Sequence, residues 1–164
     1  MAILTMPVPP EATTVESMAR VVEREFKHHG PDISIEQWRE GQGSANLFTR
    51  QRLVRNVPYR NIYGCDSRSD LLYIDDMSGL RLRIELVSQQ SSGSVDEKFP
   101  FWLINAQTCM PESIIWMVIE GNGPRPGAMQ WLKREAAQSA KVIRILSLAE
   151  LKASVRTVLT ELGR

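Results

Sequence analysis

The sequence predicts an α/β protein in which helices flank a mixed β-sheet, and three features of the chain lead to this fold class. Apolar side chains recur at helical spacing over residues 14–28 and predict an amphipathic helix. Residues 80–88 alternate between apolar and polar side chains, a pattern typical of a strand with one buried face. Residues 113–120 form a continuous apolar run, as in strands that are buried on both faces. A hairpin followed by alternating helices and strands then gives a layered α/β architecture.

Most of the expected elements have recognisable boundary signals. Thr13 or Thr14 can cap the first helix and Gly30 can end it, while the serines at 91–94 form a loop that can cap a later helix. The expected elements, in order, are an irregular lead-in with three prolines (1–11), a helix (14–28), a short strand (34–40), an unassigned stretch (41–58), strands (62–65, 69–75 and 80–88), a helix (95–107), a strand (113–120), a helix (128–138), a strand (142–146) and a helix (149–162).

Length and composition narrow the function classes. A chain of 164 residues has the length of one domain, so we expect residues 1–164 to form a single domain. The net charge of +1 means that any nucleic-acid surface must come from local clustering. Two cysteines and two adjacent histidines do not supply a structural zinc site. We find no signal peptide and no membrane span, and therefore expect a soluble, cytoplasmic protein without a membrane partner.

Residues 66–89 place two carboxylates opposite each other. If Asp76 pairs with Gly79 across the turn, the register puts Asp70 opposite Glu85, with Cβ atoms about 5 Å apart. One face of the hairpin is then apolar and belongs to the core: Leu71, Tyr73, Leu82, Ile84 and Leu86. The other face carries the carboxylates among mixed neighbours: Arg68, Asp70, Leu72, Ile74, Arg83, Glu85, Val87 and Gln89.

Two facing carboxylates repel, and the repulsion raises their pKa unless a cation relieves it. A divalent ion such as Mg²⁺, held by one or two carboxylates and phosphate oxygens, is one solution. A salt-bridge network in which Arg83 and Arg68 neutralise the pair is the other. The spacing alone favours neither interpretation.

The same residues carry a resemblance to a known family. Ser69-Asp70, followed after fourteen residues by Glu85-Leu86-Val87, resembles the acidic half of the PD-(D/E)XK nuclease superfamily, which includes restriction endonucleases and Holliday-junction resolvases. The longer string from Glu85 through the Gly93-Ser94 loop to Asp96-Glu97-Lys98 is similar to one branch of that superfamily, as is the stretch from Asn56-Val57-Pro58-Tyr59 to Asp70. The resemblance covers about residues 48–120 and implies a restriction-endonuclease-like fold with an α-βββ-α-β core.

The resemblance implies metal-assisted hydrolysis of phosphodiester bonds, most readily in DNA. Carried over, Asp70 and Glu85 would hold Mg²⁺ or Mn²⁺, which would polarise the phosphate and lower the pKa of an attacking water. Gln89 would lie on the face of Glu85 and orient water or phosphate. Lys98 begins the next helix, where the family motif also has a lysine. Because no second domain is expected, a homodimer is the implied arrangement for cutting both strands.

One position departs from the family pattern. Val87 stands where the family usually has a lysine, and a lost electrostatic group of this kind commonly costs about 10²–10³ in rate. Lys98, Arg68, which the register places opposite Val87, and Arg83 are candidates to replace it. The alternative is a catalytically degenerate pseudonuclease that binds nucleic acid or a protein partner.

An arginine cluster precedes the acidic hairpin. Residues 41–65 contain no Asp or Glu and have a local charge of +4, and Phe48 and Tyr59 lie among the arginines. Arginines and aromatic rings together suit phosphate contact and base stacking, so we predict a nucleic-acid surface made of Arg50, Arg52, Arg55, Arg60 and Arg68. The alternative is a solvated loop whose arginines pair with acids elsewhere.

Overall fold

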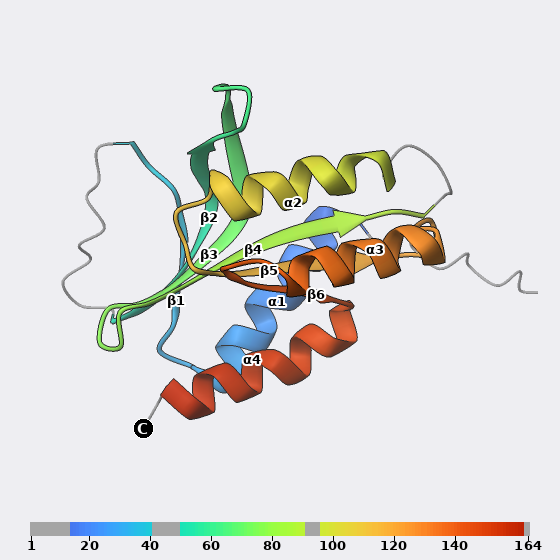
Figure 1. The fold of residues 1–164 in the computed structure, drawn as a ribbon. Coiled ribbons are helices and arrows are strands. Elements are labelled where there is room, and N and C mark those ends of the chain that lie inside the picture. The colour runs from blue at the N-terminus through green and yellow to red at the C-terminus, as the bar shows by residue number, and fades with distance from the viewer. Residues whose placement is uncertain (1–13, 41–49, 91–95, 163–164) are drawn as a thin grey trace, which may run out of the picture.

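The computed structural model describes residues 14–40, 50–90 and 96–162, and Figure 1 shows how they fold. The lead-in at 1–11 and the loop at 91–94 lie outside the described residues. In chain order the elements are α1 (Val15–His29), β1 (Ser34–Gln37), β2 (Gln51–Arg60), β3 (Asp66–Asp75), β4 (Leu80–Ser88), the 3₁₀ turn η1 (Asp96–Lys98), α2 (Phe99–Thr108), β5 (Ile114–Glu120), α3 (Pro126–Ala137), β6 (Val142–Leu146) and α4 (Leu148–Leu162).

The six strands form one mixed sheet in the order β1-β2-β3-β4-β5-β6. β2, β3 and β4 are antiparallel neighbours, joined by hairpin turns, while β4, β5 and β6 run parallel and are connected through α2 and α3. Short hairpins suit antiparallel pairs, and helical crossovers are what parallel pairs require. The predicted fold class is therefore confirmed, and the α/β layers follow from the connections.

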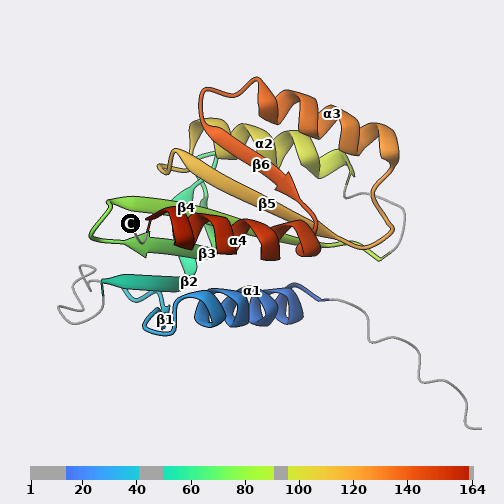
Figure 2. The ribbon, with the colours of Figure 1, turned by 90° about the horizontal axis from the view of Figure 1, so that it is seen from below.

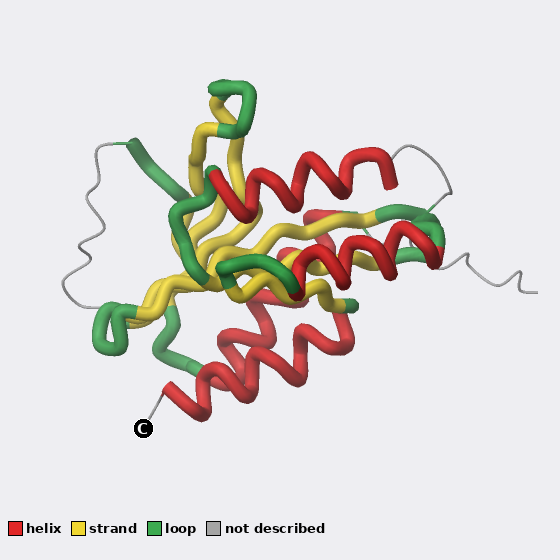
Figure 3. Tube along the Cα trace, in the orientation of Figure 1, coloured by secondary structure: helices red, strands yellow, loops and turns green. Residues whose placement is uncertain are grey.

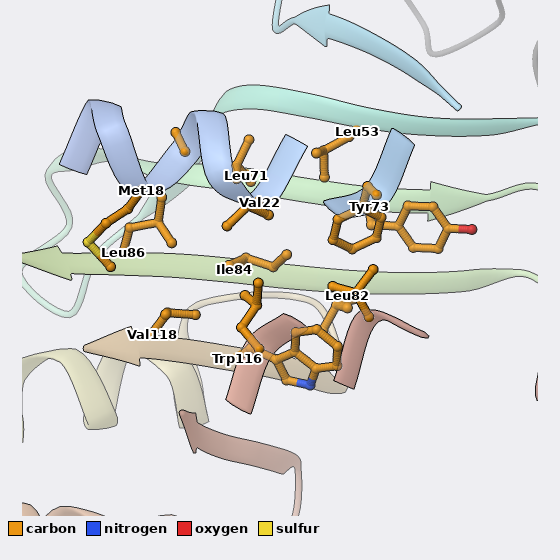
Figure 4. Packing of buried hydrophobic residues seen from close by; sticks show 14 of the residues in the cluster. Met18, Val22, Leu53, Leu71, Tyr73, Leu82, Ile84, Leu86, Trp116 and Val118 are labelled. Atoms are coloured by element: carbon orange, nitrogen blue, oxygen red, sulfur yellow. The ribbon is translucent and has the colours of Figure 1, made fainter. Parts of the chain in front are cut away.

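Helices cover both faces of the sheet, as Figures 2 and 3 show. Helices α1 and α4 pack on one face, and their buried residues share an apolar cluster with Leu71, Tyr73, Ile84 and Trp116 of the sheet (Figure 4). Helices α2 and α3 cover the other face in a second cluster. None of the helices in the described part of the chain is long and apolar enough to cross a membrane.

Several predicted elements are confirmed nearly to the residue. Strands 80–88 and 142–146 have the predicted bounds, and the first helix has the predicted cap, because the Thr14 side chain accepts a hydrogen bond from the backbone N–H of Ser17. The apolar run at 113–120 is the buried strand β5, with helices on both sides of the sheet.

Two assignments around β2 are wrong or missing. Residues 51–60 of the unassigned stretch form a long strand, and the strand expected at 62–65 is instead the turn between β2 and β3. The arginines and Pro58 of β2 give it the composition of a loop, and its burial does not alternate along the strand. Proline is tolerated there because β1 flanks β2 only from Arg52 to Arg55, which leaves Pro58 with β3 as its one described neighbour.

Candidate active site

The hairpin of β3 and β4 has the predicted register, but its ladder stops short of the carboxylates. The paired residues run from Asp75↔Leu80 to Leu71↔Ile84, which confirms the register for these five pairs. The next pair would be Asp70 and Glu85. At that point the Asp70 carboxylate accepts a hydrogen bond from the backbone N–H of Leu86, at 2.8 Å. A side chain thus takes the place of the backbone ladder beside Glu85.

Strand β2 is distorted at the level where the β3–β4 ladder ends. Asn56 of β2 has a φ of 55°, in the left-handed region that few residues other than glycine adopt. Its carbonyl accepts a hydrogen bond from Arg68 Nη1 at 3.0 Å. Beyond this point β2 and β3 stay paired with each other, from Val57↔Ser69 to Arg60↔Asp66.

The distortion also changes which side chains meet. Leu71 belongs to the core under α1, and regular alternation would turn Ser69 to the same face. Ser69 instead accepts a hydrogen bond from Arg83 Nη1 at 2.6 Å, and Arg83 pairs with Leu72 on the other face. The expectation that Arg68 faces Val87 is wrong for the same reason, because the β3–β4 ladder has ended and Arg68 contacts β2.

Glu85 is half-buried, with one of its two carboxylate oxygens enclosed by protein. Its Oε1 atom is inaccessible to solvent and has no hydrogen-bond partner among the described residues. Burial raises the pKa of Glu85 to about 8. A hydrogen bond with Ser69 and the charge of Arg83 lower this pKa, whereas the charges of Asp70 and Glu112 raise it. Burial therefore outweighs the favourable contacts.

Asp70 is also half-buried and is held by backbone groups. Burial raises its pKa, and the hydrogen bonds from the amides of Leu86 and of Asp70 itself lower it in part. Two neighbouring carboxyl groups, both with raised pKa, are the arrangement that a bound cation relieves.

Another acid, Glu112, lies next to this pair, but both of its carboxylate oxygens have a hydrogen-bond donor. Arg83 and Glu112 have side chains only 1% and 3% exposed and form a two-point ion pair, with Arg83 Nε donating to one oxygen and Nη2 to the other at 2.9 Å. The guanidinium also lies 5.7 Å from the ring centroid of Tyr59. The salt-bridge alternative, in which Arg83 and Arg68 neutralise Asp70 and Glu85, is therefore wrong in its partners: Arg83 binds Glu112, which the sequence analysis missed, and Arg68 donates to the backbone of Asn56.

Asp70 and Glu85 together could hold a divalent cation, although they are only two acidic side chains. The described residues contain no group of three His, Cys, Asp or Glu side chains that could hold a metal. Asp70 and Glu85 supply two hard oxygen donors, and the buried Oε1 atom lacks a donor of its own. Mg²⁺ is commonly held by one or two carboxylates together with waters and phosphate oxygens, so two protein ligands suffice.

The other two predicted site residues lie at the ends of neighbouring elements. Gln89 is buried directly after β4, where its N–H donates to Glu120 O and its carbonyl accepts from Gly123 N. The fit is tight, because a Cβ on Gly121 would come within 1.9 Å of that carbonyl oxygen. Lys98 is exposed at the end of η1, directly before α2.

The five arginines predicted to bind nucleic acid fall into two groups. Arg52 is buried and paired with Asp76 at 2.8 Å, and Arg55 pairs with Glu16 and Glu23 of α1, so both stabilise the fold. Their pairing with distant acids agrees with the alternative interpretation of the cluster, although both arginines lie on strand β2 and not in a solvated loop. The other three are exposed, on β2, β3 or the residue before β2: Arg50, Arg60 and Arg68.

The mixed sheet, with a hairpin that carries two adjacent carboxyl groups, defines an α/β protein with an acidic site. A family model for the PD-(D/E)XK nuclease superfamily domain matches residues 12–159, most of the chain. The chain therefore belongs to the PD-(D/E)XK nuclease superfamily, and the predicted family is confirmed. A search of curated proteins finds no significant match.

Proposed function

We propose that this protein is a metal-dependent nuclease that hydrolyses phosphodiester bonds in DNA. The observation that carries the proposal is the buried, unpartnered Oε1 of Glu85 beside Asp70, at the point where the β3–β4 ladder opens. An acid that is merely structural acquires partners when it is buried, as Glu112 does. A site that leaves one carboxylate oxygen without a donor is suited to a cation.

In this proposal Asp70 and Glu85 hold Mg²⁺ or Mn²⁺, and the ion when bound supplies Lewis-acid activation of the phosphate and of water. The backbone N–H of Leu86 fixes the Asp70 carboxylate, and Ser69 fixes that of Glu85. Gln89 and Lys98 are proposed to orient water or phosphate.

The exposed arginines are proposed to contact the nucleic-acid backbone, since arginine matches phosphate with two donors. Arg60 and Arg68 lie on the same strand pair as Asp70, and Arg50 directly precedes β2. We propose further that residues 1–164 act as one domain, in the cytoplasm, and that two copies associate to cut both strands of a duplex.

Plasmid cleavage with Mg²⁺ or Mn²⁺ tests the proposal. Glu85→Gln keeps the shape of the side chain but removes the charge, and we expect it to abolish cleavage. Glu40→Gln changes an exposed glutamate and is the matched control, which we expect to cut like the wild type. Cleavage that survives in Glu85→Gln contradicts the assignment of the site.

A catalytically degenerate pseudonuclease that binds nucleic acid or a protein partner is the second candidate, and Val87 is the observation that favours it. The Val87 side chain packs in the apolar cluster with Phe99 and Leu103 of α2. No cleavage with any divalent metal, together with no calorimetric binding of Mn²⁺, would support this candidate. Increased cleavage by Val87→Lys would support the first, because the scaffold would then need only the missing charge.

A further inference from the structure

The β2–β3 hairpin forms an arm that extends past the rest of the sheet. Beyond Asn56 and Asp70, the arm consists of the pairs from Val57↔Ser69 to Arg60↔Asp66 and the turn at 61–65. β1 pairs only as far as Arg55, and the β4 ladder ends at Leu71. Figure 1 shows the arm projecting on the side of the sheet that α2 covers. We call its turn, residues 61–65, the arm tip.

The arm tip displays an aromatic ring. Tyr63 is 74% exposed, the most exposed of the large hydrophobic residues in the described part of the chain. Its ring stacks on that of Phe101 from α2, with centroids 5.5 Å apart and an angle of 22° between the ring planes. The exposed ring of Tyr63 is thus supported on one face by Phe101, which comes from an element distant in sequence.

The backbone of the arm tip is fixed by its own side chains. The Asn61 carboxamide oxygen accepts hydrogen bonds from the N–H groups of Tyr63 and Cys65, at 2.9 and 3.1 Å. Gly64, with a φ of 72°, supplies the left-handed residue that closes a three-residue hairpin loop. The position of Tyr63 is therefore set by the turn before any ligand binds.

A buried amide ties the arm tip to α2. The N–H of Ile62 donates to Asn105 Oδ1 at 2.9 Å, and Asn105 is fully buried. Asn105 in turn donates through Nδ2 to the carbonyl of Phe101 at 2.7 Å. One side chain thus links the turn that carries Tyr63 to the helical turn that carries Phe101. A surface that is ordered in advance loses less entropy on binding.

Exposed cations accompany the ring. Arg60 directly precedes the arm tip and is 78% exposed, and its contact with exposed Asp66, at 3.6 Å, is of the weak surface kind. Arg68 is exposed on the opposite strand of the arm. Exposed aromatic rings beside cations are how proteins bind single-stranded nucleic acid, with bases stacked on the rings and phosphates near the charges.

The arm tip lies close to the candidate active site. Asp70 is four residues along β3 from Asp66, a distance of about 13 Å at the rise of a strand. Val87, two residues from Glu85 and on the same face of β4, packs under α2, the helix that carries Phe101. A strand of nucleic acid a few nucleotides long would therefore span from the ring to the carboxylates.

We propose that Tyr63, backed by Phe101, is a stacking platform for an unpaired nucleobase. The substrate would then carry a single-stranded or unpaired stretch next to the phosphodiester bond that lies at Asp70 and Glu85. This inference rests on the proposed function in that it takes nucleic acid as the ligand, and it adds which form of nucleic acid is bound.

Fluorescence anisotropy in EDTA tests the platform without cleavage. The probes are a labelled thymidine 20-mer, the corresponding uridine 20-mer and a 20-base-pair DNA duplex. We expect Tyr63→Ala to weaken binding of a single-stranded probe about tenfold, the size typical of losing one stacked base, and to leave duplex binding nearly unchanged. Comparison of the thymidine and uridine 20-mers shows whether DNA or RNA supplies the base.

Matched variants make the result specific. Met77→Ala truncates a residue that is 69% exposed at the tip of the other hairpin, and we expect no change in binding. Tyr63→Trp keeps an aromatic face and should bind at least as tightly as the wild type. Unchanged single-strand affinity in Tyr63→Ala overturns the platform, and so does an equal loss on duplex; a protein-docking role for the arm tip predicts the first of these results.

The binding test and the cleavage test can fail independently of each other. Tyr63-dependent binding without Glu85-dependent cleavage supports the platform and contradicts the nuclease. Glu85-dependent cleavage in a protein whose single-strand affinity ignores Tyr63 supports the nuclease and overturns the platform.

Discussion

Two glutamates lie close to Arg83, the buried Glu112 and the half-buried Glu85, and their carboxylates differ in their hydrogen-bond partners. Both oxygens of Glu112 accept hydrogen bonds from the Arg83 guanidinium, whereas Oε1 of Glu85 is buried without a partner in the described residues. Asp70, the other acid beside Glu85, offers it only repulsion. Among the carboxylate oxygens of the described residues, Glu85 Oε1 is the one that is buried without a hydrogen-bond partner, and a bound cation would satisfy it. The contrast shows that a buried charge alone does not identify the candidate site. A carboxylate oxygen that lacks a hydrogen-bond donor is the more informative feature.

The hydrogen bonds of Arg83 explain why the contrast persists. Three of its five N–H groups bind Glu112 and Ser69, and its influence on Glu85 is the attraction of its charge. We call Arg83–Glu112 the finished pair, because both oxygens of Glu112 have donors. We call Asp70–Glu85 the open pair, because Oε1 of Glu85 has no donor among the described residues.

Breaking the Arg83–Glu112 pair gives the largest loss of stability that we expect from a single substitution. Glu112→Ala leaves the Arg83 guanidinium buried without its counter-ion, which typically costs about 3–5 kcal/mol of the free energy of unfolding. Urea denaturation measures this loss. Glu40→Ala, at an exposed glutamate, is the control and should stay within about 0.5 kcal/mol of the wild type. A loss for Glu112→Ala as small as that of the control would show that the pair carries no structural weight.

The open pair predicts a pH-dependent stability in the metal-free protein. In the folded state the pKa of Glu85 is raised to about 8, while an unfolded glutamate titrates at about 4.3. Between these values the folded state holds a proton that the unfolded chain has released. The free energy of unfolding should therefore fall as pH rises through this window, by at most about 1.4 kcal/mol per unit, and level off above pH 8.

Glu85→Gln isolates this contribution. Its stability should decline less steeply between pH 5 and 8 in EDTA, with the remaining slope including the raised pKa of Asp70, which acts in the same direction. Urea denaturation at a series of pH values measures both slopes. Equal slopes for wild type and Glu85→Gln would mean that Glu85 titrates normally.

How far the sequence predicts the molecule depends on the range of each interaction. The β3–β4 register was predictable because it follows from local signals, a turn closed by Gly79 with a φ of 72° and strict alternation in β4. Strand β2 was not, because Arg52 and Arg55 look like solvent-facing residues until their partners, Asp76 and Glu16, are known.

The candidate site divides in the same way. Asp70 and Glu85 could be found from the hairpin and the resemblance, both of which are local. Glu112 could not, since it lies 29 residues from Arg83 and no pattern distinguishes it from an exposed loop acid. The turn of Ser69 toward Arg83 depends on a distortion at Asn56, which only the three-dimensional structure reveals.

Adding a metal ion should close the open pair and produce a smaller gain. At a free Mn²⁺ concentration about 100 times its Kd, a single native-state site stabilises a protein by about 2.7 kcal/mol. We expect thermal denaturation to show this gain in the wild type and in the Glu40→Gln control, and to show much less in Glu85→Gln. Equal stabilisation of all three proteins would place the ion elsewhere.

The smallest effect comes from Ser69, the residue that connects the two pairs. Ser69→Ala removes the hydroxyl that accepts from Arg83 and bonds Glu85, with an expected loss of about 1 kcal/mol. Because that bond lowers the pKa of Glu85, its removal should also move upward the pH at which the stability of the metal-free protein levels off. Ser69→Thr keeps a hydroxyl and should restore both properties. A stability loss without a pH shift would mean that Ser69 supports Arg83 alone, and that the finished and open pairs are independent.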